Sequence, residues 1–128
     1  MIYIDTSVVL AHLLSETRVP PSTLWGEFLV SSRLLEYELW NRINALGLGK
    51  SHGQLARDML GRLALVELLP TVLARSLEPF PTVVRTLDAL HLSTVDYLRN
   101  GRQDVTVATY DGRMATAARA MGFRLFEL

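Results

Sequence analysis

Short runs of β-branched and aromatic residues alternate with helical patterns along the whole chain of 128 residues. We expect strands at 1–5, 28–32, 65–70, 105–110 and 123–128. This alternation is typical of an α/β fold with a mostly parallel sheet, because each parallel strand pair needs a helical crossover. The sequence therefore predicts an α/β sandwich, with right-handed crossovers if the sheet is parallel. The pattern leaves the order of the strands open.

Sequence signals mark where the helices between these strands begin and end. We expect helices over 6–14, 32–49, 51–64, 83–99 and 111–122, a short helix after Pro21, and one or two turns in 71–81. Candidate N-caps are Thr6 or Ser7 for the first helix and Ser51 for the third. Gly47 and Gly49 are expected to close the second helix.

The composition excludes several classes of protein. With 49% hydrophobic residues and no linker-like segment, residues 1–128 are expected to form a single domain. The absence of cysteine excludes a disulfide framework and a thiolate metal site, and it suits a cytoplasmic protein. No apolar run reaches the roughly 18 residues of a membrane span, and the N-terminus lacks the pattern of a signal peptide.

An aspartate interrupts the most apolar of these helices. In "VRTLDALHLSTV" (84–95), apolar side chains surround most of the helix, which predicts burial. The neighbours of Asp88 on its own face are Val84, His91, Leu92 and Val95. Burial of an unpaired carboxylate costs on the order of several kcal/mol. Asp88 is therefore expected to have a partner.

Three other acids occupy positions that are unusual for acids. Asp5 ends the first expected strand and Asp111 directly follows the fourth, so both are expected at the carboxyl edge of the sheet, where ligands bind in such folds. Glu38 borders the apolar face of its helix. With Asp88, these are four acids on four elements. Capping is an alternative role for Asp5 and Asp111, because each precedes a helix.

Ion pairing is an alternative role for the two helical acids. Glu38 has Arg42 at i+4 as a candidate partner. Asp88 has Arg85 at i−3 and His91 at i+3. His91 itself is more commonly a packed core residue than a ligand.

Taken together, four converging carboxylates favour a site for a hard divalent cation. Ionised carboxylates raise one another's pKa unless a cation neutralises them. Oxygen ligands without cysteine select Mg²⁺ or Mn²⁺ over zinc. Such an ion activates water and polarises a phosphodiester. Neither a Gly-rich phosphate loop nor a GxSxG motif occurs, which disfavours nucleotide-binding kinases, dehydrogenases and serine hydrolases.

The basic residues permit an RNA partner. The formal net charge is zero, yet Lys50 is the only lysine and the other 12 basic residues are arginines. Arginine suits bidentate phosphate contact and base stacking. Removing four acids from a chain with 13 basic and 13 acidic residues leaves a charge of +4. An ordinary arginine-rich solvated surface is the alternative.

Four segments that together span most of the chain carry a family resemblance. They are "MIYIDTSVVL", "SSRLLEYELWNRI", "VRTLDALHLSTV" and "VATYDGRMATAARAMGF". The sequence resembles the PIN-domain family, and within it the VapC-type ribonuclease toxins of toxin–antitoxin pairs. The resemblance implies an α/β/α sandwich with a central parallel sheet and an acidic Mg²⁺ or Mn²⁺ site that cleaves RNA.

Carried over residue by residue, the resemblance assigns metal-binding and catalytic roles to Asp5, Glu38, Asp88 and Asp111. Glu36 competes with Glu38 for the helical position, because "LLEYEL" holds both. We prefer Glu38 because the aliphatic Leu39 follows it, as in the family. Small hydroxyl residues are expected to support the acids through hydrogen bonds, namely Thr6, Ser7 and Thr109. The resemblance assigns no role to residues 51–82.

The resulting prediction is a Mg²⁺-dependent endoribonuclease that cleaves RNA with metal-activated water, with Mn²⁺ as a substitute. The resemblance further implies a toxin, a homodimer, and a small VapB-like antitoxin as partner. Three alternatives stay open: a PIN-type RNA-processing nuclease without a toxin role, a catalytically silent α/β protein-binding module, and a receiver-like domain. The receiver is disfavoured because it needs a late lysine, and Lys50 is the only lysine.

Overall fold

Five parallel strands form one sheet at the centre of the computed structural model, which describes residues 1–128. The strands are β1 (Ile2–Ile4), β2 (Leu29–Ser32), β3 (Ala64–Val66), β4 (Thr106–Ala108) and β5 (Arg124–Leu125). Their order across the sheet is β3-β2-β1-β4-β5. The predicted α/β fold with a parallel sheet is confirmed, and every strand overlaps its predicted range.

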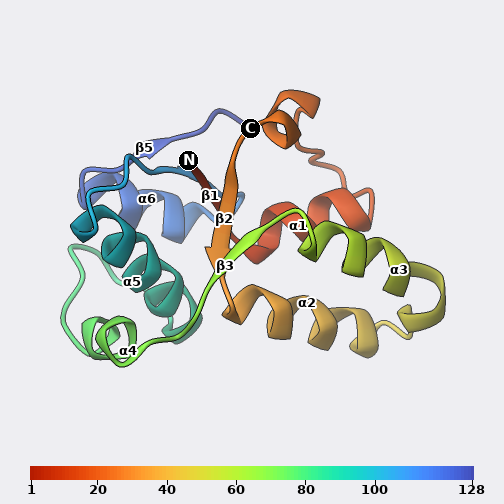
Figure 1. Ribbon diagram of the computed structural model, residues 1–128, viewed down its shortest axis with the longest axis horizontal. Helices are drawn as coiled ribbons and strands as arrows, with labels where there is room; N and C mark the ends of the chain where they lie inside the picture. Colours follow the sequence, from red (N-terminus) through yellow and green to blue (C-terminus); the bar gives the residue numbers. More distant parts are fainter.

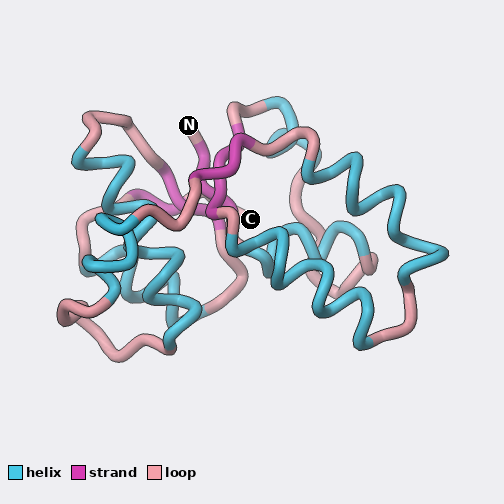
Figure 2. Tube along the Cα trace, turned by 60° about the horizontal axis from the view of Figure 1, so that its bottom comes forward, coloured by secondary structure: helices cyan, strands magenta, loops and turns pink.

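Helices cover both faces of this sheet (Figure 1). On one side lie α1 (Thr6–Leu13), α2 (Leu34–Ala45) and α3 (Gly49–Leu60). On the other lie α4 (Pro70–Ser76), α5 (Thr86–Asn100) and α6 (Gly112–Ala120). A 3-10 helix, Ser22–Gly26, lies between α1 and β2. Figure 2 shows the strands between the two groups of helices. None of the helices combines the length and apolarity that crossing a membrane requires.

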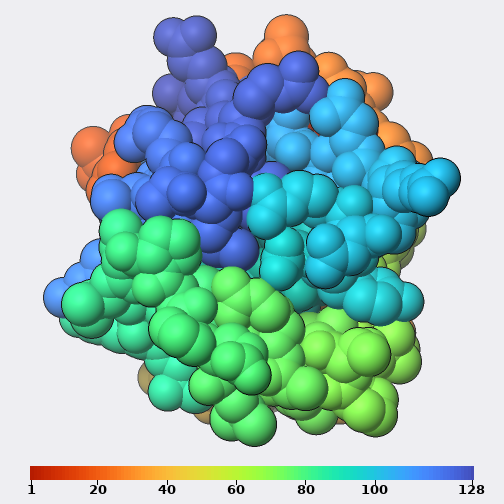
Figure 3. Space-filling model, turned by 90° about the vertical axis from the view of Figure 1, so that its left-hand side faces the viewer, coloured from red at the N-terminus to blue at the C-terminus, as the bar shows by residue number.

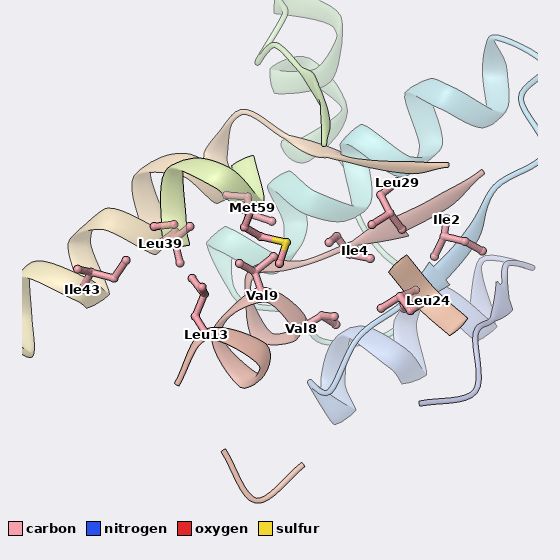
Figure 4. Packing of buried hydrophobic residues seen from close by; sticks show 13 residues of the cluster. Ile2, Ile4, Val8, Val9, Leu13, Leu24, Leu29, Leu39, Ile43 and Met59 are labelled. Carbon is pink, nitrogen blue, oxygen red and sulfur yellow. The ribbon is translucent and has the colours of Figure 1, made fainter. Parts of the chain in front are cut away.

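The alternation of side chains along β1 explains why both faces need cover. Ile2 and Ile4 face one layer, where they belong to a buried apolar cluster with residues of α1, α2 and α3 (Figure 4). The labelled members of this cluster from the helices are Val8, Val9, Leu13, Leu39, Ile43 and Met59. Burial of each Val, Leu, Ile or Met side chain stabilises the fold by about 1.5–3 kcal/mol.

Tyr3 faces the opposite layer, where a second buried cluster forms. Its members from the sheet include Val30 and Val107, and its members from α5 and α6 are Leu92, Val95, Met114, Ala117 and Ala118. Figure 3 views the molecule from this side, where α4, α5 and α6 cover the sheet. Tyr3 is fully buried, so its hydroxyl group needs a partner inside this layer.

Two glycines end helices where the sequence places them. Gly47 follows α2 with φ +67°, and Gly122 follows α6 with φ +89°. Both values lie in the left-handed region, which glycine adopts without the steric cost of a Cβ atom. The prediction that Gly49 also closes α2 is wrong, because Gly49 is the first residue of α3.

The three predicted N-caps are wrong as well. Thr6 and Ser7 lie inside the first turn of α1, because the chain turns into the helix directly after β1. Asp5 occupies the N-cap position of α1, but its side chain accepts no hydrogen bond from the helix amides. Ser51 lies within α3 and donates to the carbonyl oxygen of Leu48.

The helix that carries Asp88 differs from its prediction in two respects. It begins at Thr86 rather than at residue 83, since Arg85 is still extended, with ψ 166°. It is also not buried on all sides, because Leu87 is 48% exposed and Tyr97 is 40% exposed. α4, whose first residue is Pro70, and the sheet cover only part of its surface. The apolar composition of this helix therefore overstates its burial.

The order of the strands reverses between β1 and β4. Moving from β1 to β2 and β3 leads to one edge of the sheet, whereas β4 and β5 lead to the other. Ile4 of β1 lies opposite Ala108 of β4, so the residues that follow these two strands leave the sheet side by side at its carboxyl edge. Ligands bind at such switch points in parallel α/β sheets.

Candidate functional site

A hollow of about 400 Å³ opens at the carboxyl edge of β1 and β4. The four predicted acids line it together, namely Asp5, Glu38, Asp88 and Asp111. Asp5 directly follows β1, Asp111 lies three residues after β4, and the other two acids come from α2 and α5. The fold therefore brings together carboxylates that are more than a hundred residues apart in the chain.

Asp5 is the most buried of these acids, with an exposed fraction of 5%. Two hydroxyl groups hold its carboxylate: Ser7 Oγ donates to Oδ1, and Thr109 Oγ1 donates to Oδ2. Burial raises the pKa of Asp5, and these hydrogen bonds oppose the shift. The carboxylate is thus fixed in one orientation at a position where ionisation is unfavourable.

Asp111 has the capping geometry that the sequence left open as an alternative. Its Oδ1 accepts hydrogen bonds from the backbone N–H of Arg113 at 2.9 Å and of Met114 at 3.2 Å. Its own backbone N–H donates to Thr109 Oγ1 at 2.9 Å. The Thr109 hydroxyl group therefore connects Asp5 with the chain at Asp111. Capping uses only one carboxylate oxygen, so the other is free to face the hollow.

Asp88 forms neither of the contacts that the sequence offered as alternatives. Its side chain makes no ion pair with Arg85 and no hydrogen bond with His91. Burial raises the pKa of Asp88, and the negative charge of Asp111 raises it further. The two carboxylates are therefore close enough to repel each other across the hollow.

Glu38 is held from two sides. Thr6 Oγ1 donates to Glu38 Oε1 at 2.7 Å, and His91 Nε2 lies 2.6 Å from the same oxygen. The alternative ion pair with Arg42 does not form. Glu36 instead pairs with Arg33 at 2.7 Å and does not line the hollow. The structure thus separates the two glutamates of "LLEYEL" by their surroundings.

Sequence reasoning missed the contribution of His91 and Tyr3. The Tyr3 hydroxyl group lies 2.7 Å from His91 Nδ1, and His91 is 3% exposed. Burial strongly raises the pKa of Tyr3, so its hydroxyl group stays protonated. The Glu38 carboxylate can only accept, so His91 Nε2 donates to it, and the other ring nitrogen, Nδ1, is left to accept from the Tyr3 hydroxyl group. The only signal in the sequence was that His91 shares a helix face with Asp88.

Comparison with known proteins identifies the family to which this fold and this acidic hollow belong. The family model described as "PIN domain" matches residues 2–120. The chain belongs to the PIN domain family. Two relatives of this PIN domain are ribonucleases of Mycobacterium tuberculosis. VapC47 is 29% identical, with 96% of this chain and 93% of the relative covered, and VapC46 is 32% identical, with 94% and 92% covered.

A solved structure resembles this PIN domain over its whole length. The structure of Mycobacterium tuberculosis VapC20, described as a toxin that cleaves the sarcin-ricin loop, matches with a TM-score of 0.73. The match covers 100% of both chains at 16% sequence identity. At this identity the likeness establishes the shared fold.

The donor chemistry of this PIN domain fits a hard cation, but the four acids do not form one common coordination shell. All four offer oxygen ligands, which Mg²⁺ and Mn²⁺ prefer. No three of the His, Asp and Glu side chains lie close enough together to hold one ion. Mg²⁺ commonly keeps several waters and takes only one or two carboxylates directly, so this arrangement is compatible with it.

We expect Tyr3→Phe to destabilise this PIN domain by about 1–2 kcal/mol, because His91 Nδ1 would lose its buried donor. Urea denaturation followed by circular dichroism measures the effect. Tyr37→Phe is the matched control, since Tyr37 is 67% exposed and its change should stay within about 0.5 kcal/mol. Equal stability of the two variants would show that the buried hydroxyl group does not support His91.

Proposed function

We propose that this PIN domain is a metal-dependent endoribonuclease that acts as the toxin of a VapC-type toxin–antitoxin pair. The observation that carries the proposal is the convergence of Asp5, Glu38, Asp88 and Asp111 on one hollow at the switch point of the sheet. Its relatives VapC46 and VapC47, both ribonucleases, support the same reaction class. In this proposal a single nuclease domain acts on cytoplasmic RNA as a homodimer, and a small VapB-like antitoxin restrains it.

The residues that would hold Mg²⁺, or Mn²⁺ in its place, are the four acids that line the hollow. When bound, the ion supplies an activated water and charge stabilisation for the phosphodiester. Asp88 and Asp111 repel each other, and a cation bound in the hollow would offset this repulsion. The hollow is thus adapted to a cation rather than to an anionic ligand alone.

The remaining polar residues position the acids. Ser7 and Thr109 fix both oxygens of Asp5, and Thr6 with His91 fixes one oxygen of Glu38. These donors leave each carboxylate with unused lone pairs for water or a cation. Preorganised side chains of this kind need no rearrangement when charge develops on the phosphate. Their support resembles the outer hydrogen bonds that orient metal ligands in other proteins.

Removal of divalent metal tests the proposal. We expect the purified protein to cleave single-stranded RNA in millimolar Mg²⁺ or Mn²⁺ and to lose cleavage in excess EDTA, because the four acids alone would repel phosphate. The measurement is the appearance of labelled RNA fragments on a denaturing gel, with recovery on adding Mg²⁺. Cleavage that persists in EDTA would overturn the metal mechanism.

Two further measurements separate the toxin from the alternatives. Light scattering at tens of micromolar is expected to give a dimer, and expression without an antitoxin is expected to arrest growth. A metal-dependent nuclease that is monomeric and harmless on expression would instead be an RNA-processing enzyme. A protein that cleaves no RNA under any of these conditions would be a binding module.

A further inference from the structure

A second hollow, of about 600 Å³, lies directly beside the acidic one. The two share four lining residues: Ser7, Leu10, Arg42 and Asp111. The residues that line only the second hollow include Glu16, Arg18 and Tyr110. This volume lies within the roughly 300–1,000 Å³ that small-molecule and cofactor sites occupy. One continuous depression therefore joins the four carboxylates to Arg42, which lines both hollows, and to Arg18 and Tyr110, which line only the second.

The arginines of this second hollow have no carboxylate partner. Four other arginines of the chain pair with acids, namely Arg33, Arg75, Arg99 and Arg124. Arg18 and Arg42 are exposed and form no such pair, although Glu16 and Asp111 line the same hollow. Two guanidinium groups with free donors beside a depression make an electrostatic site for an anion, and their planar forks match phosphate oxygens.

Arg18 also contacts Tyr110 in two ways. The Arg18 guanidinium lies over the Tyr110 ring, 5.4 Å from its centre, and donates to the Tyr110 carbonyl oxygen at 3.5 Å. Stacked guanidinium and aromatic planes are the platforms on which the bases of single-stranded nucleic acids stack. An acidic peptide would use the two charges but not this platform, so the surface favours a nucleotide.

We propose that the hollow formed by Arg18, Arg42 and Tyr110 binds the nucleotide of single-stranded RNA next to the cleaved phosphodiester, an inference that rests on the proposed function. Arg42, which lines both hollows, contacts the backbone phosphate adjacent to the acids. The following base stacks on the outer face of the Arg18 guanidinium, which lies over the Tyr110 ring. Base stacking of this kind tolerates any base, so the subsite gives affinity and direction of binding rather than sequence specificity.

The test compares the double variant Arg18→Gln/Arg42→Gln with Arg57→Gln. Arg57 is a matched control because it is exposed, has no carboxylate partner, lies over the Trp40 ring at 5.8 Å, and lines neither hollow. Binding of a fluorescein-labelled 12-nucleotide RNA is measured by anisotropy in EDTA over a series of salt concentrations, together with kcat and KM for cleavage in Mg²⁺. Melting curves establish that all variants fold.

For the double variant we expect affinity to fall about five- to twentyfold, and KM to rise by a similar factor with kcat changed less than about threefold. The slope of log Kd against log salt should decrease by about 1.4, which corresponds to two lost phosphate contacts on a single strand. Arg57→Gln should change affinity and KM less than twofold. Together these results would support the subsite.

Other outcomes overturn the subsite or separate it from the proposed function. Cleavage by the double variant with unchanged KM would overturn the subsite and leave the ribonuclease in place. RNA binding that the double variant loses, in a protein that never cleaves RNA, would support the subsite and reject the ribonuclease. Binding of poly-glutamate with the same dependence on Arg18 and Arg42, without binding of RNA, would assign the hollow to an acidic protein segment and overturn the proposal.

Discussion

Asp88→Asn is expected to lower RNA cleavage by at least about a hundredfold, because it removes a negative charge from the cation site while keeping the shape of the side chain. Asp88 forms no ion pair in the structure, and the amide oxygen of asparagine can still accept the hydrogen bond of the Arg85 backbone N–H. The measurement is single-turnover cleavage of labelled RNA in Mg²⁺.

The same substitution is expected to stabilise the protein in EDTA at pH 7. Burial and the charge of Asp111 raise the pKa of Asp88, so the native state disfavours the ionised form. Below about pH 4, the Asp88 carboxyl is neutral in the native state and its burial costs little stability. As the pH rises through the raised pKa, ionisation favours the unfolded state, and the native state loses this stability. Asparagine avoids this loss. After allowance for solvent screening, the gain is about 0.5–1 kcal/mol, or about 2–4 °C in Tm.

Mg²⁺ and pH provide the controls for this experiment. Mg²⁺ should raise the Tm of the wild type more than that of Asp88→Asn, because the ion binds the native acidic hollow. The difference in Tm without metal should shrink toward pH 4. Asp58→Asn, which changes an exposed acid that contacts only Gln54, should alter neither cleavage nor the Mg²⁺ response. If Asp88→Asn melts lower and still cleaves RNA, Asp88 is a structural residue.

Replacement by asparagine also tests Asp5 and Asp111, whose structural contacts differ from those of Asp88. Asp111→Asn keeps the cap of α6, because the amide oxygen of asparagine can accept the hydrogen bonds from Arg113 and Met114. Any loss of cleavage in this variant then reports on the missing charge rather than on the helix. Asp5→Asn should likewise lose cleavage, and burial of its carboxylate predicts a gain in metal-free stability.

Glu38→Gln is expected to lower cleavage by about a hundredfold or more, whereas Glu36→Gln should change it less than about twofold. Glutamine at 38 can still accept from Thr6 and His91, so the variant should fold with the site in place but without the charge. Glu36 is paired with Arg33 away from the hollow, and loss of such an exposed pair costs about 0–1 kcal/mol. The measurement is kcat and KM for both variants in Mg²⁺.

These two variants also decide between the glutamates independently of the fold. Full activity in Glu38→Gln with loss in Glu36→Gln would assign the helical acid to Glu36 and overturn the site described above. Thermal melting of both variants excludes unfolding as the cause of any loss.

The sequence predicts the elements of this fold well because local patterns determine them. The local sequence pattern predicts β1, which ends before Asp5, and β4, which precedes Asp111. It also predicts the helix that carries Asp88. The order of the strands is different, since it depends on contacts between segments far apart in the chain. The predicted start of α5 is three residues too early. The residues directly before Thr86 are extended, and no glycine or proline among them marks the helix start.

The choice between Glu36 and Glu38 shows a limit of pattern reasoning. Both flank the buried stripe of α2 formed by Leu35, Leu39 and Ile43, on opposite sides. The stripe indicates which face of the helix is inward, but not which flank lies toward the carboxyl edge of the sheet. Packing of α2 against α1 and the sheet decides that. The sequence pattern also does not predict the hydrogen bond between Tyr3 and His91. The two residues are 88 positions apart, and only the packing of the fold brings them together.

The position of β4 beside β1 also determines when the hollow can form during synthesis. Asp5, Glu38 and Asp88 are translated first, but the strand that neighbours β1 and the Thr109 hydroxyl group that holds Asp5 come only after residue 105. A nascent chain or a fragment that ends within α5 leaves one edge of β1 unpaired and lacks Asp111. Under the proposed function, such a chain has no complete acidic hollow. The order of the strands thus makes the acidic hollow depend on the synthesis of β4 and of the residues up to Asp111.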